Sequence, residues 1–245
     1  MLLLEAIKDP QVKSEAGKLL IQSASKGNQL STVELGLELD YVRRNENFLE
    51  RAMMNTSSLP IYERLYPLAL EVGTAKQRSY PLYIVSQGIL DYFRGMAGLG
   101  AVPILDHLLH RQPDLALVTW YKRDRSVDFN PLYIAARRGR LEAVAYLLQN
   151  PKEFPLSHSV LVAAAKYGNP DVVQLLLEQP GTADWPLGEA LEHAICREHE
   201  KVARLLLAAG SPRLTANDIA NSLAVAAKRG VESMEALILE YDHQR

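Results

Sequence analysis

The sequence predicts an all-α fold, a solenoid of about six or seven stacked helix–turn–helix units. Three observations support this prediction: segments of the second half align with one another, a glycine recurs inside them, and apolar residues follow that glycine at helical spacing. A unit this small cannot bury its apolar face alone, so each unit must stack on its neighbours.

Five segments align without a gap, with a period of 29 to 39 residues. They are Met96–Leu109, Ala135–Leu148, Ala164–Leu177, Ala194–Leu207 and Ala226–Leu239. Small residues open most of them, as in Ala135-Ala136, where a methyl group lets two helices pack closely. Self-similarity at such a period is typical of repeat proteins.

A glycine ends the first helix of most units. This column holds Gly100, Gly139, Gly168 and Gly230. Glycine at a helix end readily adopts the left-handed conformation that other residues avoid. Glu198 occupies the column in the remaining unit and predicts a strained or remodelled turn there. Beyond the glycine, Val144 and Leu148 are spaced by four, which is one face of a short second helix.

The opening of one unit resembles a known family. Residues 130–136 read NPLYIAA and residues 139–142 read GRLE, and together they closely resemble the ankyrin signature, which opens T-P-L-H-x-A-A. The resemblance extends from about residue 89 to 240 and implies an ankyrin-repeat solenoid. Asn130 and Tyr133 stand where the family has a threonine and a histidine that tie adjacent repeats together by hydrogen bonds. The resemblance therefore does not carry those ties over to this chain.

The pattern divides the chain into two regions. Residues 1–88 carry degenerate, irregular ankyrin-like repeats, and residues 89–245 carry regular repeats in a single continuous solenoid. Leu20–Leu37 is predicted as a first repeat, with Ala24, Gly27, Val33 and Leu37 near the expected spacing and one extra residue. Asn47–Leu68 fits a degenerate second repeat. Residues 81–84 have the same sequence, PLYI, as residues 131–134. This segment is interpreted either as an insertion or as an extended first helix.

Composition and charge exclude several functions. The net charge of −2 argues against a general nucleic-acid binder, which usually has a basic excess. Cys196 is the one cysteine, so no intrachain disulfide can form and a reducing compartment is expected. The apolar start, residues 1–4, is too short for a signal peptide, and no window is apolar enough for a membrane span. We expect a cytoplasmic or nuclear monomer that does not bind membranes.

Two motifs resemble ligand sites and are interpreted as structural. Gly95–Gly100 looks like a phosphate-binding loop, but it lies on the small-residue and glycine columns of a repeat. His193, Cys196 and His199 are possible zinc ligands, but positions six apart on a helix point to different faces and no fourth ligand lies nearby. The sequence therefore predicts no metal and no cofactor. It also contains no nucleophile–base motif, so we do not expect an enzyme.

A row of cations lies between the alanines and the glycine of successive repeats. In the ankyrin family these positions end the first helix and face the concave groove. We call them the basic row: Arg137, Arg138, Lys166, Tyr167, Cys196, Arg197, Lys228 and Arg229. The row carries six positive charges and predicts a partner with an acidic surface. Cations also offset the dipole at a helix C-terminus by roughly 0.3–1 kcal/mol each, which is the alternative explanation.

Aromatic residues gather in the middle of the chain, where ten of the 17 lie between Tyr62 and Tyr133. The longest connecting loop spans Gln112 to Asn130, and aromatic and basic side chains cluster at its tip. These tip residues are Trp120, Tyr121, Lys122, Arg123 and Arg125. Trp, Tyr and Arg dominate the energetics of interfaces, so the tip is predicted to bind the partner.

The sequence therefore predicts a protein–protein adaptor that binds through its groove and loop tips. An alternative is an enzyme or small-molecule binder with a pocket in the aromatic-rich, irregular N-terminal half, near Tyr83 and Phe93. In the adaptor, Tyr62, Tyr66, Tyr83 and Phe93 would instead fill an irregular core.

Overall fold

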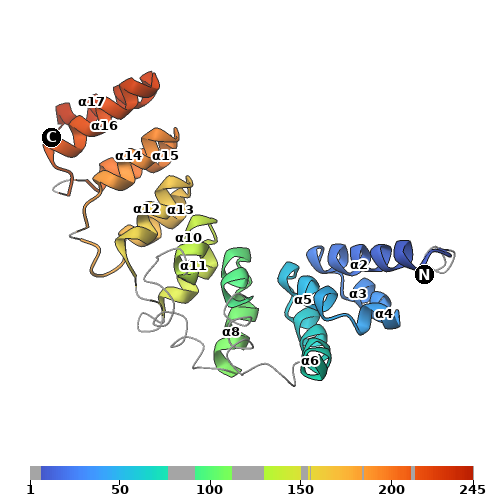
Figure 1. Cartoon of the computed structure of the whole chain (residues 1–245). Coiled ribbons are helices and arrows are strands. Elements are labelled where there is room, and N and C mark those ends of the chain that lie inside the picture. Colours follow the sequence, from blue (N-terminus) through green and yellow to red (C-terminus); the bar gives the residue numbers. More distant parts are fainter. Residues whose placement is uncertain are drawn as a thin grey trace. The chain divides into compact units, whose positions relative to one another are not determined.

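The computed structural model describes residues 7–76, 92–111, 130–149, 154, 156–183, 185–210 and 213–244. Over these ranges every regular element is a helix, which confirms the all-α prediction (Figure 1). The chain forms two compact units. The N-terminal unit comprises Met1–Met96 and Ala101–Leu115, and the C-terminal unit comprises Ala97–Gly100 and Ala116–Arg245. The domain boundary expected at residue 88 stays a prediction, because residues 77–91 lie outside the described ranges.

The C-terminal unit consists of helix pairs in two layers. The first helices of the pairs are α10 (Pro131–Arg137), α12 (His158–Lys166), α14 (Gly188–Cys196) and α16 (Ala216–Arg229). The second helices are α11 (Leu141–Leu148), α13 (Pro170–Leu177), α15 (Glu200–Ala208) and α17 (Glu232–Gln244). Each first helix packs against the next first helix, and each second helix against the next second helix (Figure 1). This stacking confirms the predicted solenoid.

The small and apolar columns of the repeat form the core of this unit. Ala135, Ala164 and Ala194 have no exposed surface, so neighbouring helices approach closely at these positions. The leucines three positions earlier are also fully buried. They are Leu132, Leu161 and Leu191. Burying such a side chain stabilises a fold by about 1.5–3 kcal/mol, so each repeat adds apolar stabilisation only when its neighbour covers it.

The turn inside each repeat has one backbone form. The four column glycines have φ between 66° and 79°. Glu198 keeps this left-handed form, with φ of 60°, so its turn is strained rather than remodelled. The same hydrogen bond closes each turn: the amide of Arg140 donates to the carbonyl of Ala135 over 2.9 Å, and that of His199 to Ala194 over 2.9 Å.

The N-terminal unit contains longer and less regular helices. They are α2 (Pro10–Lys26), α3 (Leu30–Leu37), α4 (Asp40–Arg43), α5 (Glu46–Asn55), α6 (Leu59–Lys76) and α8 (Val102–Arg111). Helices α2 and α6 have 17 and 18 residues, and α6 contains Pro67 in its interior. Segment Asn47–Leu68, predicted as a degenerate repeat, forms α5 and the first half of α6, which pack against each other.

The first repeat needs no extra residue, and the alignment through Gly27 was wrong. Gly27 has φ of −84°, whereas Asn28 has φ of 53° and occupies the left-handed position of the turn. The amide of Gln29 donates to the carbonyl of Ala24 over 2.8 Å, which is the same closing hydrogen bond as in the other repeats. Asparagine is one of the few residues that tolerate this conformation, so the column accepts it.

Candidate protein-binding surface

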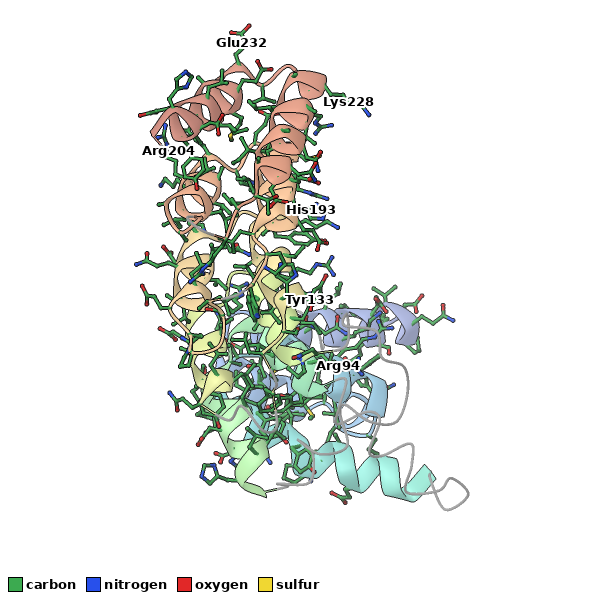
Figure 2. The ribbon with its side chains drawn as sticks, turned by 90° about the vertical axis from the view of Figure 1, so that its left-hand side faces the viewer. Arg94, Tyr133, His193, Arg204, Lys228 and Glu232 are labelled. Carbon is green, nitrogen blue, oxygen red and sulfur yellow. The ribbon has the colours of Figure 1, made fainter. Side chains whose placement is uncertain are left out.

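The basic row lies along one edge of the first-helix layer in the C-terminal unit. Arg137, Lys166 and Cys196 are the last residues of α10, α12 and α14, and the next residue forms each C-cap. Lys228 and Arg229 are the last two residues of α16, and Gly230 is its C-cap. Figure 2 shows Tyr133, His193 and Lys228 on the first-helix side, and Arg204 on the opposite side with the second helices. Six members of the row are exposed, and Lys166 and Cys196 are half-buried.

In the part of the chain that the structure describes, carboxylates do not neutralise this row. Within the described ranges, none of its six cations forms an ion pair with an aspartate or glutamate. Glu192 is the one carboxylate in the last two turns of α10, α12, α14 and α16. Arg138 and Lys228 form no hydrogen bond or ion pair with any described residue, so their charges face solvent.

Two arginines of the row contact the aromatic ring between them. The guanidinium carbon of Arg137 lies 4.7 Å from the centroid of the Tyr167 ring, and that of Arg197 lies 5.5 Å from it. Helices α10 and α14 flank α12, so these arginines come from the repeats before and after the tyrosine. We call Arg137, Tyr167 and Arg197 the arginine–tyrosine cluster. It joins the row across three consecutive repeats by cation–π contact.

Side chains of one repeat also cap the first helix of the preceding repeat. Asn169 Nδ2 donates to the carbonyl of Arg137 over 3.1 Å, and His199 Nε2 donates to that of Lys166 over 3.2 Å. Arg140 Nε reaches the carbonyl of Gly98 over 3.2 Å, and a guanidinium nitrogen of Arg229 reaches that of Cys196 over 2.7 Å. These carbonyls occupy one repeat position at a helix C-terminus, where orphan acceptors need partners.

This capping supplies ties between repeats that the sequence analysis missed. Asn130 accepts from the amide of Leu132 over 2.7 Å and therefore caps its own helix, α10. Three of the four capping side chains instead stand at the position after the turn residue, and the fourth, Arg229, stands before its turn residue. The position after the turn residue holds Arg140, Asn169 and His199. These three residues differ in type and share only a side-chain N–H donor, so comparing residue types between repeats does not reveal this position.

The structure does not describe every predicted site residue. The loop tip, with Trp120, Tyr121, Lys122, Arg123 and Arg125, lies outside the described residues, as does Tyr83. The segment that resembled a phosphate loop ends a helix over residues 92–99, and Gly100 makes the left-handed turn. This geometry agrees with the structural interpretation. Among the described residues, no three His, Cys, Asp or Glu side chains lie close enough to hold a metal ion.

Several of the described aromatic residues of the N-terminal unit pack against one another or into its core. Tyr62 stacks on Tyr66 and Tyr92 with both centroid distances at 5.3 Å, and the ring of His107 meets its edge at 5.7 Å. Tyr62 and Phe93 are buried. Burial, with a smaller contribution from Tyr62, raises the pKa of Tyr92 well above its ordinary value. This hydroxyl therefore stays protonated at neutral pH, and the rings fill space as a core does.

Paired helices stacked in two layers, with a left-handed turn inside each pair, define a helical repeat protein. A family model of ankyrin repeats in three copies matches residues 97–187 and, again, residues 132–218. The chain belongs to the ankyrin-repeat family through residues 97–218. No curated protein sequence matches the chain. Ankyrin repeats are generally protein–protein interaction modules. No helix among the described residues is both long and apolar enough to span a membrane.

Proposed function

We propose that the chain is a protein-binding adaptor whose basic row binds an acidic surface of its partner. The loop tip from Trp120 to Arg125 adds aromatic contacts to the same partner. The observation that carries the proposal is that cations at helix C-terminal ends recur along the first-helix layer and are absent from the ends of α11, α13 and α15. First helices α10, α12 and α16 end in arginine or lysine, and Arg197 caps α14. Second helices α11, α13 and α15 have no basic residue in their last turns.

Compensation of the helix dipole does not explain this asymmetry. All these helices have the same dipole per residue, so the dipole favours cations equally at the ends of both layers. A partner that contacts the C-terminal ends of the first helices accounts for the cations at these ends. An unneutralised row also steers an acidic partner toward the surface and makes its association rate fall with salt.

Matched charge reversals test the role of the row. We expect the full chain to bind immobilised poly-L-glutamate, and the double variant Arg197→Glu/Lys228→Glu to bind it at least about tenfold more weakly. The control is Lys201→Glu/Arg204→Glu on α15, which changes the net charge equally on the opposite layer. We avoid Arg229, because it caps Cys196. Equal losses in the two variants, or no binding by the wild-type chain, would contradict the proposal.

The loop tip is tested separately. Trp120→Ala/Tyr121→Ala should weaken capture of a partner that the basic row also binds, because large rigid rings dominate interface energy. Thermal unfolding of this variant should match the wild-type chain. A large loss of stability would show instead that these rings pack into the fold and contribute no contact to the partner.

A further inference from the structure

The arginine–tyrosine cluster sets a distance between two positive charges. Each guanidinium carbon lies at its measured distance, 4.7 or 5.5 Å, from one ring centroid, so the two carbons are separated by no more than the sum of these distances. Helices α10 and α14 pack on either side of α12 (Figure 1). Two cations from different repeats therefore lie within about 10 Å of each other beside Tyr167.

The rest of the row continues at a similar spacing. Packed helices lie about 8–10 Å apart, and α12, α14 and α16 are consecutive neighbours in the first-helix layer. Arg197 caps α14 and Lys228 lies in the last turn of α16, so the next cation after Arg197 stands on the neighbouring first helix. From Arg197 to Lys228 the row thus advances by one helix spacing, about 9 Å along the layer.

Only one common extended conformation repeats its side chains at this interval on one face. A polyproline II segment has three residues per turn and rises about 3.1 Å per residue, so side chains three apart lie about 9 Å apart on the same side. In a β-strand, side chains on one face lie about 6.6–6.8 Å apart. In an α-helix, residues four apart are only about 6 Å apart.

The exposed ring of Tyr167 fits the same kind of ligand. The residue is 38% exposed between the two arginines. Polyproline II segments dock on aromatic side chains, and their preformed conformation limits the entropy lost on binding. The cluster therefore offers two cations for acidic side chains, with an aromatic surface between them for the residues that separate those acids.

From these spacings we propose that the basic row recognises an acidic segment of the partner in the polyproline II conformation, with an acidic residue at every third position. Arg137 and Arg197 bind two successive acidic side chains, and Tyr167 contacts the residues between them. Lys228 extends the register by a further turn. This inference rests on the proposed function and adds to it the conformation and charge spacing of the bound segment.

Peptides of equal composition test the spacing. Each peptide contains four Glu and eight Pro: one is (Glu-Pro-Pro)4, and the other has its four Glu in one block. Calorimetry with the full chain should give the spaced peptide about tenfold higher affinity, because only its charges match the row. Equal affinities would overturn the register proposal and leave the acidic-partner proposal standing. Failure of both peptides to bind would overturn the acidic-partner proposal as well.

A variant of the cluster provides a second test. Tyr167→Ala should lower the affinity for the spaced peptide about tenfold and leave that for the block peptide within about twofold. Tyr167→Phe keeps the ring and is expected to preserve the preference. Thermal unfolding checks that both variants are folded, which the exposure of Tyr167 favours. Loss of affinity for both peptides in Tyr167→Ala would show that the ring merely positions charge, and would contradict a contact with the spacer residues.

Discussion

The two units make the same turn and link it to the next repeat in different ways. In the N-terminal unit the turn residue itself makes the link: Asn28 Oδ1 accepts from Thr56 Oγ1 over 3.0 Å and from the amide of Ser57 over 3.2 Å. In the C-terminal unit the turn residue is a glycine in every repeat except that of Glu198, and the link comes from the following repeat, as in Asn169 to Arg137. Both units therefore need a left-handed residue at the turn, but different residues make the hydrogen bonds that link the turn to the next repeat.

This difference explains where glycine is required. A Cβ atom added to Gly139 would lie 2.5 Å from Asn169 Oδ1, and one added to Gly168 would lie 2.6 Å from His199 Nδ1. The capping side chain thus occupies the space beside the turn. Next to Glu198 the following repeat has Val231 at the capping position, and Arg229 makes the hydrogen bond instead. The turn position therefore has room for the Glu198 side chain, and only the left-handed backbone conformation is unfavourable.

The largest expected effect tests whether the two units share one core column. Ile21 and Leu161 both lie three residues before the first alanine of their repeats and have no exposed surface. Ile21→Ala and Leu161→Ala should each lower the free energy of unfolding by about 2–5 kcal/mol, measured by urea denaturation. Val12→Ala, at a position 54% exposed on α2, is the control and should change it by less than about 0.5 kcal/mol. A small effect at Ile21 would contradict the corrected alignment.

The next effect separates the space beside a turn glycine from its backbone conformation. Gly168→Ala should cost about 2–3 kcal/mol, because it adds a collision with His199 to the cost of a left-handed alanine. Gly230 has the same conformation with nothing within 4 Å, so Gly230→Ala should cost only about 1–2 kcal/mol. Chemical denaturation in a His199→Ala background should reduce the difference between the two. Unchanged costs in that background would rule out the collision.

A smaller effect concerns the link in the N-terminal unit. Asn28→Gly keeps the left-handed turn and removes the hydrogen bonds to Thr56 and Ser57, so it should cost about 1 kcal/mol. Gly27→Ala is the matched control at the adjacent residue, whose φ is −84°, and should change stability by less than about 0.5 kcal/mol. The reverse order of costs in thermal unfolding would restore Gly27 as the turn residue.

The smallest effect is a gain of stability. Glu198→Gly relieves a left-handed glutamate, although the unfolded chain also gains freedom, so the net stabilisation should be about 0.5–1 kcal/mol. A modest rise in the melting temperature by circular dichroism is the expected result. A fall would show that the Glu198 side chain contributes more than its backbone conformation costs.

The sequence predicted most of the repeat, because glycine reports directly on a left-handed backbone. Asn28 was missed because asparagine tolerates the same conformation and a glycine stands beside it. The capping ties were missed for a different reason: Arg140, Asn169 and His199 share an N–H donor but no residue type, and their acceptors are backbone carbonyls. Because every residue has a backbone carbonyl, the sequence does not indicate which carbonyl accepts a hydrogen bond.

The candidate surface was partly predictable. The positions of the cations followed from the repeat columns, and the structure places Arg137, Lys166 and Lys228 in the last turns of first helices α10, α12 and α16. The contact of two arginines with Tyr167 depends on side-chain rotamers across three repeats, which no local pattern records. The absence of basic residues at the ends of α11, α13 and α15 was readable in the sequence and becomes meaningful only once the layers are known.

The capping between repeats has a consequence for how such a chain changes in evolution. Each tie runs from a donor in the later repeat to a carbonyl in the earlier one. The earlier repeat supplies the carbonyl whatever its sequence, but its turn residue must be glycine where Asn169 or His199 fills the space beside the turn. A duplicated repeat that brings such a donor can therefore follow any repeat that has glycine at its turn. Arginine, asparagine and histidine fill equivalent roles because their acceptor is a backbone carbonyl.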